Sequence, residues 1–357
     1  MLTIPQLLRF MVSQGASDLH LSAGEAPMMR VHGEMYRVDA PAMSPEETHR
    51  LIFDCMNDMQ RKTFQEKLEV DFAFALDETL RFRVNTFVQN RGEGAVFRSI
   101  PHKIPRFEDL GLPPIVRALC DEEKGLVLVT GPTGSGKSTT LAAMIDYINE
   151  TTQGHILTLE DPIEFVHKSK KCLVNQREIG TQSKSFNAAL RSALREDPDV
   201  ILVGELRDLE TISLALTAAE TGHLVFATVH TSSAAKTVDR LVDVFPANQQ
   251  AQIRTMVSES MIGVVTQMLL HKVGGGRAAA LEILVGTPAV RNLIRESKTH
   301  QIPSAMQVGG KAGMQTMEAA LMDLVGKGKI TMDEVRKRMP DTAAAMERSG
   351  QHVGGAR

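Results

Sequence analysis

The chain has 357 residues, 43% of them hydrophobic, and a formal net charge of −3 at pH 7. This length is sufficient for two hydrophobic cores, and the apolar content is typical of a globular protein. An aromatic content of 4% and the lack of tryptophan argue against a nucleic-acid motor, which commonly shows a basic face or aromatic stacking platforms. A local basic patch is still compatible with this composition, so that class stays open as an alternative.

Targeting and metal-binding signals are absent from the sequence. The cysteines Cys55, Cys120 and Cys172 lie far apart, which predicts reduced thiols and no local zinc site. The first residues lack the basic segment and cleavage site of a signal peptide. No apolar run approaches the roughly 20 residues of a membrane-spanning helix. We therefore expect a cytoplasmic protein that does not span a membrane.

Residues 1–100 are predicted to form a small α/β domain. A hairpin is expected around His32, and Ser44 opens a capping box for a helix that runs to about Met56. Strand-like alternation follows in "VDFAFAL", "LRFRVNTFV" and "GAVFRSI". The proline-rich residues 101–115 are predicted to be a linker.

The predicted strand "LRFRVN" places Arg81 and Arg83 on one face and Phe82 and Val84 on the other. From the pattern alone, this is a half-buried strand with a solvated basic face. The alternative is that both arginines are supplied to a nucleotide at an interface between subunits.

Residues 116–300 show short apolar strands that alternate with helices: "GLVLVTG", "HILTLED", "DVILVGE" and "HLVFATVH". This order predicts a RecA-like P-loop ATPase core, a parallel sheet with helices on both faces. After Thr266 we expect a return to helices, interrupted by a hairpin-like "GGRAAALEILV". Residues 301–357 are predicted to be a helical region that ends in a flexible tail.

The segment "GPTGSGKS" fits the motif G-x-x-x-x-G-K-[ST] and lies between a buried strand and a helix. Glycines let backbone N–H groups turn toward phosphate oxygens, and the helix N-terminus adds its dipole. Lys137 is expected to be exposed in the empty loop and to reach the β- and γ-phosphates, while the Ser138 hydroxyl ligates Mg²⁺. The sequence therefore predicts binding of ATP and Mg²⁺ by Gly131, Thr133, Gly134, Ser135, Gly136, Lys137, Ser138 and Thr139.

Two carboxylates follow predicted strands at the edge where a parallel sheet binds its ligands. Glu160 stands where a water-activating base belongs, although Glu-Asp-Pro alone is more simply a turn cap. Glu205 follows the run 200–203, where an aspartate commonly helps to hold Mg²⁺. We expect Glu205 to ligate the metal through water or to share the base role with Glu160. Arg207 and Asp208 are interpreted as an ion pair or turn.

Two histidines bracket the last predicted strand of the core. His230 follows the strand at its carboxyl end and could donate a hydrogen bond to a γ-phosphate oxygen. The simpler interpretation is a structural histidine with its hydrogen bonds satisfied. His223 precedes the strand, so a direct role is less expected for it than for His230.

Taken together, these stretches resemble the PilT twitching-motility ATPases, the retraction motors of type IV pili in the type II/IV secretion ATPase superfamily. The matching segments, in chain order, are "ASDLHL", "RFRVN", "GPTGSGKST", "LTLEDPIEF", "RSALREDPDVILVGELRD", "TGHLVFATVHT" and "AVRNLIRE". The last one differs from the family's AIRNLIRE box only at Val290, and generic P-loop ATPases lack it.

The resemblance implies a PAS-like first domain and a ring hexamer, with nucleotide bound between two domains whose relative orientation changes during ATP turnover. It gives Glu160 and Glu205 the base and metal-side roles, and Arg81 and Arg83 the charge-neutralising role. Paralogues that extend pili usually carry a long N-terminal extension and a four-cysteine zinc segment; neither is found here, which favours pilus retraction.

The implied partners are other copies of the chain, the platform protein of the pilus in the inner membrane and, in some systems, other pilus ATPases, with no nucleic acid. The chain is then expected to be peripheral to the membrane, recruited to its cytoplasmic face. The alternatives are a nucleic-acid motor on the same core, a small-molecule kinase, and an accessory retraction or secretion paralogue. The intact Lys137, Glu160 and Glu205 argue against a non-hydrolysing paralogue.

The "AVRNLIRE" segment is predicted to be a helix. Val290, Leu293 and Ile294 then form one apolar stripe that docks onto the ATPase core. Arg291 and Arg295 lie on a neighbouring face and are expected to be free for a partner or a neighbouring subunit.

Overall fold

The structure is a computed structural model that describes residues 2–31, 33–77, 80–100 and 103–348. The expected turn at His32, the start of the expected linker at 101–102 and the expected tail beyond 348 lie outside these residues. The chain divides into two compact units. Unit 1 comprises residues 1–103 and 162–165, and unit 2 comprises residues 104–161 and 166–357.

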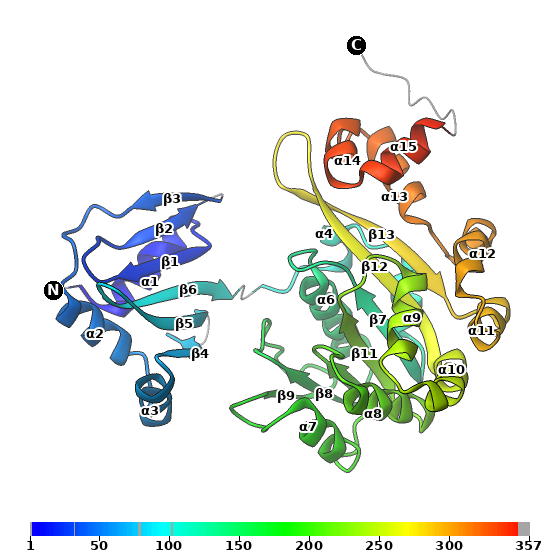
Figure 1. Cartoon of the computed structure of the whole chain (residues 1–357), viewed down its shortest axis with the longest axis horizontal. Coiled ribbons are helices and arrows are strands. Elements are labelled where there is room, and N and C mark those ends of the chain that lie inside the picture. The colour runs from blue at the N-terminus through cyan, green and yellow to red at the C-terminus, as the bar shows by residue number, and fades with distance from the viewer. Residues whose placement is uncertain (1, 32, 78–79, 101–102, 349–357) are drawn as a thin grey trace. The chain divides into compact units, whose positions relative to one another are not determined.

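Unit 1 is an antiparallel sheet with helices on one face (Figure 1). The strand order is β3-β2-β1-β6-β5-β4, and inward residues such as Leu19, Phe82 and Phe97 pack under the helices. The alternate residues of each strand point to the other face, as the two-residue period of a strand requires. The elements are α1 (Ile4–Ser13), β1 (Asp18–Ser22), β2 (Met28–Val31), β3 (Glu34–Arg37), α2 (Pro45–Phe53), α3 (Asp58–Lys67), β4 (Glu69–Ala75), β5 (Arg81–Gln89) and β6 (Gly92–Ile100).

Unit 2 is built on a seven-stranded sheet in the order β13-β12-β7-β11-β10-β8-β9. All neighbouring pairs are parallel except β12 and β13. The strands are β7 (Gly125–Thr130), β8 (His155–Glu160), β9 (Leu173–Glu178), β10 (Val200–Val203), β11 (Leu224–Val229), β12 (Met261–His271) and β13 (Arg277–Val285). The expected RecA-like core with a mostly parallel sheet is confirmed.

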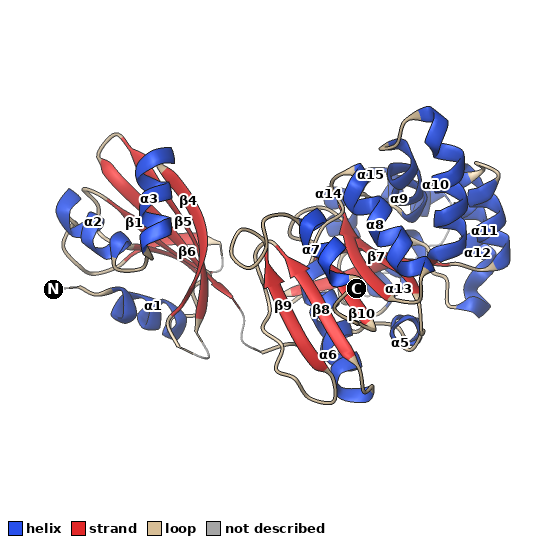
Figure 2. Ribbon diagram, turned by 90° about the horizontal axis from the view of Figure 1, so that it is seen from below, coloured by secondary structure: helices blue, strands red, loops and turns tan. Residues whose placement is uncertain are grey.

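Helices cover both faces of this sheet (Figures 1 and 2). Leu126 and Leu128 of β7 belong to one apolar cluster, and Val127 and Val129 to the other, which explains why β7 reads as an unbroken apolar run. The helices are α4 (Phe107–Leu110), α5 (Pro114–Cys120), α6 (Lys137–Thr151), α7 (Phe186–Ala193), α8 (Leu209–Glu220), α9 (Ala234–Asp243), α10 (Ala247–Ser260), α11 (Pro288–Arg295), α12 (Ile302–Val308), α13 (Met317–Gly326), α14 (Met332–Arg338) and α15 (Pro340–Arg348).

The expected return to helices after Thr266 is wrong. Strand β12 continues to His271 and pairs with β7 on one side and with the predicted hairpin strand β13 on the other. A buried strand has the same unbroken apolar pattern as a buried helix, so periodicity could not separate the two. Strand β9 was not predicted either, because "LVNQRE" is a polar edge strand.

Helices α13, α14 and α15 pack on the β12–β13 hairpin near its turn (Figure 1). Leu270 of β12 shares an apolar cluster with Leu321 of α13 and Val335 of α14. Outside the cluster, Nδ1 of His271 lies 2.9 Å from a carboxylate oxygen of Glu334. Among the described residues, no helix combines the length and apolarity needed to cross a bilayer.

Helix α11 confirms the helix predicted for "AVRNLIRE". Val290 and Ile294 are fully buried in the ATPase core, and Leu293 packs against them. The expectation that Arg291 is free is wrong: its guanidinium donates to the carbonyl oxygens of Gly286 (2.7 Å), Ser258 (3.1 Å) and Glu259. The last carbonyl oxygens of α10 have no N–H donor within their own helix, and a cationic donor at that end satisfies them well. Arg295 is exposed.

Candidate nucleotide-binding site

The loop 131–136 joins the buried strand β7 to the N-terminus of α6. Gly131 and Gly136 have φ values of 141° and 90°, which residues other than glycine rarely adopt. An α-helix leaves its first N–H groups without acceptors inside the helix, and its dipole is positive at that end. The strand, loop and helix N-terminus therefore form a site that suits phosphate.

The lysine of the loop is not exposed as expected. Lys137 is only 9% exposed, and its Nζ donates to the carbonyl oxygens of Gly131 (2.9 Å) and Pro132 (3.1 Å). The ammonium group is strongly hydrated when free, and these two carbonyls replace part of that hydration. A phosphate would compete with these carbonyls for the Lys137 ammonium group.

The other loop residues differ in exposure. Thr133 and Gly134 are exposed, Ser138 and Thr139 are half-buried, and Ser135 is buried. The Oγ atom of Ser135 is buried and has no hydrogen-bond partner among the described residues. Since buried hydroxyls are normally satisfied, this atom is one that a bound ligand or water would complete.

The predicted site residues of unit 2 lie together at the carboxyl ends of the parallel strands, as expected. Val203 of β10 is in register with Leu159 of β8 and Ala227 of β11, and Val229 of β11 is in register with Thr130 of β7. The carboxyl ends of these parallel strands therefore lie side by side. At these ends lie Glu160, the last residue of β8, Glu205, two positions after β10, His230, directly after β11, and the loop 131–136, directly after β7.

Glu205 has an environment that keeps it ionised. Its Oε2 accepts from Arg207 at 2.7 Å, and its Oε1 lies 3.5 Å from Nε2 of His230. Partial burial raises the pKa of Glu205, but Arg207, His230 and Lys137 together hold that pKa below its usual value. An ionised, half-buried carboxylate beside the loop suits a divalent cation. Arg207 thus pairs with Glu205, whereas Asp208 caps α8 by accepting from the Thr211 N–H at 2.9 Å.

Glu160 is oriented by two neighbouring side chains. Its Oε1 accepts from the hydroxyl of Thr158 at 2.7 Å and from the amide of Gln176 at 3.1 Å. Gln176 comes from β9, a strand that was not predicted, so its connection with this site could not be foreseen. The amide oxygen of Gln176 accepts from the His167 N–H at 2.8 Å, which ties the loop before β9 to the same network.

The two histidines lie at opposite ends of β11. His230 follows the strand and is exposed at the edge that carries the loop. His223 precedes the strand, and its Nδ1 lies 2.9 Å from the carbonyl oxygen of Ala218 near the end of α8. His223 therefore has a structural partner away from the nucleotide edge.

Arg81 and Arg83 lie in unit 1, on the face of β5 opposite the buried Phe82 and Val84. Arg83 is exposed, and its Nε lies 3.9 Å from a carboxylate oxygen of Asp71.

The face of the unit 1 sheet that the helices do not cover carries further arginines, which sequence reasoning missed. Arg83 is in register with Arg98 of β6, and Asp18 of β1 is in register with both Arg98 and Arg30. Burial raises the pKa of Asp18, but the hydrogen bonds from Ser17 and Arg98 hold it below its usual value. Only the strand order, which puts β1 beside β6, brings these residues into one row.

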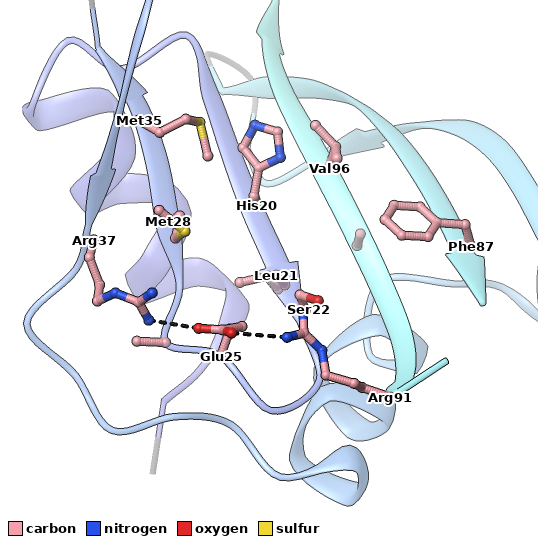
Figure 3. A pocket seen from close by; sticks show the side chains of 12 residues that line it. His20, Leu21, Ser22, Glu25, Met28, Met35, Arg37, Phe87, Arg91 and Val96 are labelled. Carbon is pink, nitrogen blue, oxygen red and sulfur yellow. Dashed lines mark hydrogen bonds and ion pairs between the residues drawn. The ribbon is translucent and has the colours of Figure 1, made fainter. Parts of the chain in front are cut away.

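Unit 1 also contains a cavity of about 380 Å³ on its sheet (Figure 3). Glu25 at its rim accepts from Arg37 at 2.8 Å and from Arg91 at 3.0 Å, and His20 lies between Met35 and Val96. Its lining holds no glycine-rich loop or helix N-terminus, so the loop 131–136 remains the site with phosphate-binding features.

A buried glutamine next to the loop is a further residue that the sequence did not indicate. The side chain of Gln267 on β12 bonds to the Ser135 carbonyl and to the Thr140 hydroxyl, both at 2.7 Å. Because residue 267 was expected in a helix, no pattern pointed to this contact.

Comparisons with known proteins agree along most of the chain. The family model described as "Type II/IV secretion system protein" matches residues 2–275. The "Type IV pilus retractation ATPase PilT" of Pseudomonas aeruginosa is 61% identical over 335 residues, which cover 94% of this chain and 97% of that protein. The "Twitching motility protein" of Neisseria gonorrhoeae is 57% identical, covering 94% of this chain and 90% of that protein.

A solved structure agrees with these relatives. The "Crystal Structure of the Pilus Retraction Motor PilT and Bound ADP" superposes with a TM-score of 0.91 at 50% identity and covers 98% of this chain and 100% of that one. The similarity therefore includes both units and the C-terminal helices. The chain belongs to the type II/IV secretion system protein family and, within it, to the PilT family of ATPases.

Proposed function

We propose that the chain is an ATP-hydrolysing motor that powers type IV pilus retraction. The observation that carries this proposal is the 61% identity to a pilus retraction ATPase over 94% of the chain. The cluster of Lys137, Glu160, Glu205 and His230 at one sheet edge supplies the chemistry that such a motor needs.

ATP is bound through its phosphates by Gly131, Thr133, Gly134, Ser135, Gly136, Lys137, Ser138 and Thr139. Mg²⁺ fits beside this loop because Ser138 offers a half-buried hydroxyl and Glu205 an ionised carboxylate. When bound, the ion neutralises charge on the β- and γ-phosphates. Glu205 would hold the ion through water.

Hydrolysis requires a water oxygen to attack the γ-phosphorus while the bond to the bridging oxygen breaks. Glu160 accepts the proton of that water, and Thr158 and Gln176 hold its carboxylate in place. His230 donates to a γ-phosphate oxygen and, through its position beside Glu205, responds to the presence of that phosphate. In this division of roles, Glu205 would help to hold the metal ion and does not act as the base.

The motor works as a ring hexamer in which Arg81 and Arg83 neutralise phosphate charge at a subunit interface. We propose the organisation expected from the sequence: a PAS-like domain, a linker, the ATPase domain and a C-terminal helical region. ATP turnover changes the relative orientation of the first domain and the ATPase domain. The ring acts on the platform protein of the pilus at the cytoplasmic face of the inner membrane.

The test is deletion of the gene followed by complementation. The deletion strain is expected to be hyperpiliated and unable to twitch, and the wild-type gene should restore retraction whereas the Glu160→Gln gene should not. Glu122→Gln, which changes an exposed glutamate, is the matched control and should restore retraction. Normal twitching in the deletion strain would overturn the proposal. Stimulation of ATPase activity by DNA or RNA in the purified protein would favour the nucleic-acid motor instead.

A further inference from the structure

We propose that Gln267 is a positioning residue that holds the loop 131–136 in its phosphate-binding conformation. The inference rests on the ATP binding proposed above and assigns a role to a residue of β12, outside the motifs of the sequence. Gln267 follows Thr266, which is in register with Thr130, the last residue of β7. The strand pairing therefore sets Gln267 beside the start of the loop.

The side-chain amide of Gln267 joins the loop to α6. Its Nε2 donates to the Ser135 carbonyl and its Oε1 accepts from the Thr140 hydroxyl, both at 2.7 Å. The orientation of the amide follows from these partners, because a carbonyl oxygen can only accept. At 3% exposure the side chain is shielded from water, so losing either bond would leave a buried polar group unsatisfied.

The loop also packs tightly against the same residue. A Cβ atom at Gly131 would lie 2.3 Å from the carbonyl oxygen of Gln267, and a Cβ atom at Gly136 would lie 2.7 Å from its Nε2. Both positions therefore require glycine because of the neighbouring protein atoms, whether or not a phosphate is bound. The loop therefore packs directly against Gln267.

The bond to Ser135 has a direct consequence for phosphate binding. In a trans peptide, the C=O and the following N–H point in opposite directions. Because Gln267 holds the Ser135 carbonyl toward β12, the N–H of Gly136 is directed to the other side of the loop. That N–H is one of the donors that a P-loop offers to phosphate.

This geometry predicts which ligands depend on Gln267. ADP and ATP bind the loop through their β-phosphate, whereas AMP lacks that group. Removal of the Gln267 amide should weaken ADP binding and leave AMP binding unchanged. A glutamine that only stabilised the fold would affect the melting temperature but not the ratio of the two affinities.

The experiment compares two leucine variants of the full-length protein. Gln267→Leu removes the bonds to the loop, and Gln315→Leu removes a glutamine that donates to the Leu281 carbonyl at 3.0 Å elsewhere in unit 2. Affinities for ADP and AMP are measured by calorimetry or competition, and melting temperatures are measured without nucleotide. We expect Gln267→Leu to raise the Kd for ADP by about tenfold, the equivalent of one lost buried hydrogen bond. Gln315→Leu should leave both affinities unchanged.

Gln267→Glu provides the test if the leucine variant does not fold. It has the same shape and can still accept from Thr140, but it replaces the donor to Ser135 by an oxygen. It should also weaken ADP binding selectively. An unchanged ADP/AMP affinity ratio in both variants would overturn the role of Gln267. Failure of the wild-type protein to bind ADP would instead overturn the proposed ATP binding, so the two failures are distinguishable.

Discussion

The Nε2 atom of His230 lies 3.5 Å from Oε1 of Glu205, although the two residues follow different strands. The other carboxylate oxygen of Glu205 is engaged by Arg207 at 2.7 Å. Both oxygens of Glu205 thus face cationic or hydrogen-bonding groups, which favours a charged, electrostatic role over proton abstraction. The hydroxyl of Thr158 and the amide of Gln176 orient the carboxylate of Glu160, which we propose as the base.

We expect Lys137→Ala to lower kcat for ATP hydrolysis by at least about 10², the loss typical of removing one group that stabilises transition-state charge. The side chain also bonds to two loop carbonyls, so the variant should bind ADP more weakly. Phosphate release and elution volume in size-exclusion chromatography are measured together. Lys124→Ala, at an exposed lysine, is the control. Retained turnover with an unchanged elution volume would contradict the role of the loop.

Glu160→Gln and Glu205→Gln should separate the two carboxylate roles. The amide at 160 can keep its acceptor oxygen toward Thr158 and Gln176, so geometry is preserved while basicity is lost. We expect kcat to fall by on the order of 10²–10⁴ with little change in ADP affinity. Glu205→Gln should mainly raise the Mg²⁺ concentration needed for half-maximal activity. Normal turnover by Glu160→Gln would transfer the base role to Glu205.

Sequence reasoning predicted those parts of the site that are local in the chain. The loop 131–136, Glu160, Glu205 and His230 each lie at or within two residues of the end of an apolar strand, and parallel strands end at a common edge. Contacts that depend on strand order were missed. Gln176 and Gln267 come from β9 and β12, whose patterns are a polar edge strand and an apolar run that a helix would also show.

The same limit applies to individual side chains. The pattern of α11 gave the apolar stripe correctly, because burial follows the helical period. It could not show that Arg291 reaches the end of α10, since that contact depends on how two helices pack. Likewise, the exposure expected for Lys137 overlooked the loop carbonyls that are available to it.

Arg83→Ala should depress ATP hydrolysis without unfolding unit 1 if the arginine serves a nucleotide at a subunit interface. Its weak pairing with Asp71 at 3.9 Å contributes little to stability. Arg83→Lys should rescue poorly, because the planar guanidinium matches phosphate oxygens and the ammonium does not. Lys62→Ala, an exposed cation in the same unit, is the control. Wild-type hydrolysis by both Arg83 variants would rule out this role.

His167 should make the fold sensitive to acid. Burial lowers its pKa to about 4 from the usual 6.5, despite the opposing effect of Asp146. Between these values the unfolded chain binds a proton that the folded protein does not, so stability is highest above pH 6.5 and falls as the pH drops toward 4. In His167→Leu, the loss of unfolding free energy between pH 7.5 and 5.5 should be smaller by about 1 kcal/mol.

Urea denaturation at the two pH values measures this difference. His300→Leu, at an exposed histidine, is the matched control. An unaltered pH dependence in His167→Leu would mean that the pKa of His167 is the same in the folded and the unfolded chain.

The two arginines of α11 should have separable effects. Arg291 donates to backbone carbonyls of Gly286, Ser258 and Glu259, so Arg291→Ala should lower the free energy of unfolding by about 1.5 kcal/mol. Arg295 is exposed, and Arg295→Ala should leave stability unchanged, since exposed charges contribute little.

If Arg295 contacts a partner of the motor, its loss should leave ATP hydrolysis by the purified protein near normal but abolish pilus retraction in cells. Denaturation, phosphate release and twitching are measured on both variants, with Lys298→Ala as the control for a nearby surface charge. Normal retraction by Arg295→Ala would exclude a coupling role for this side chain.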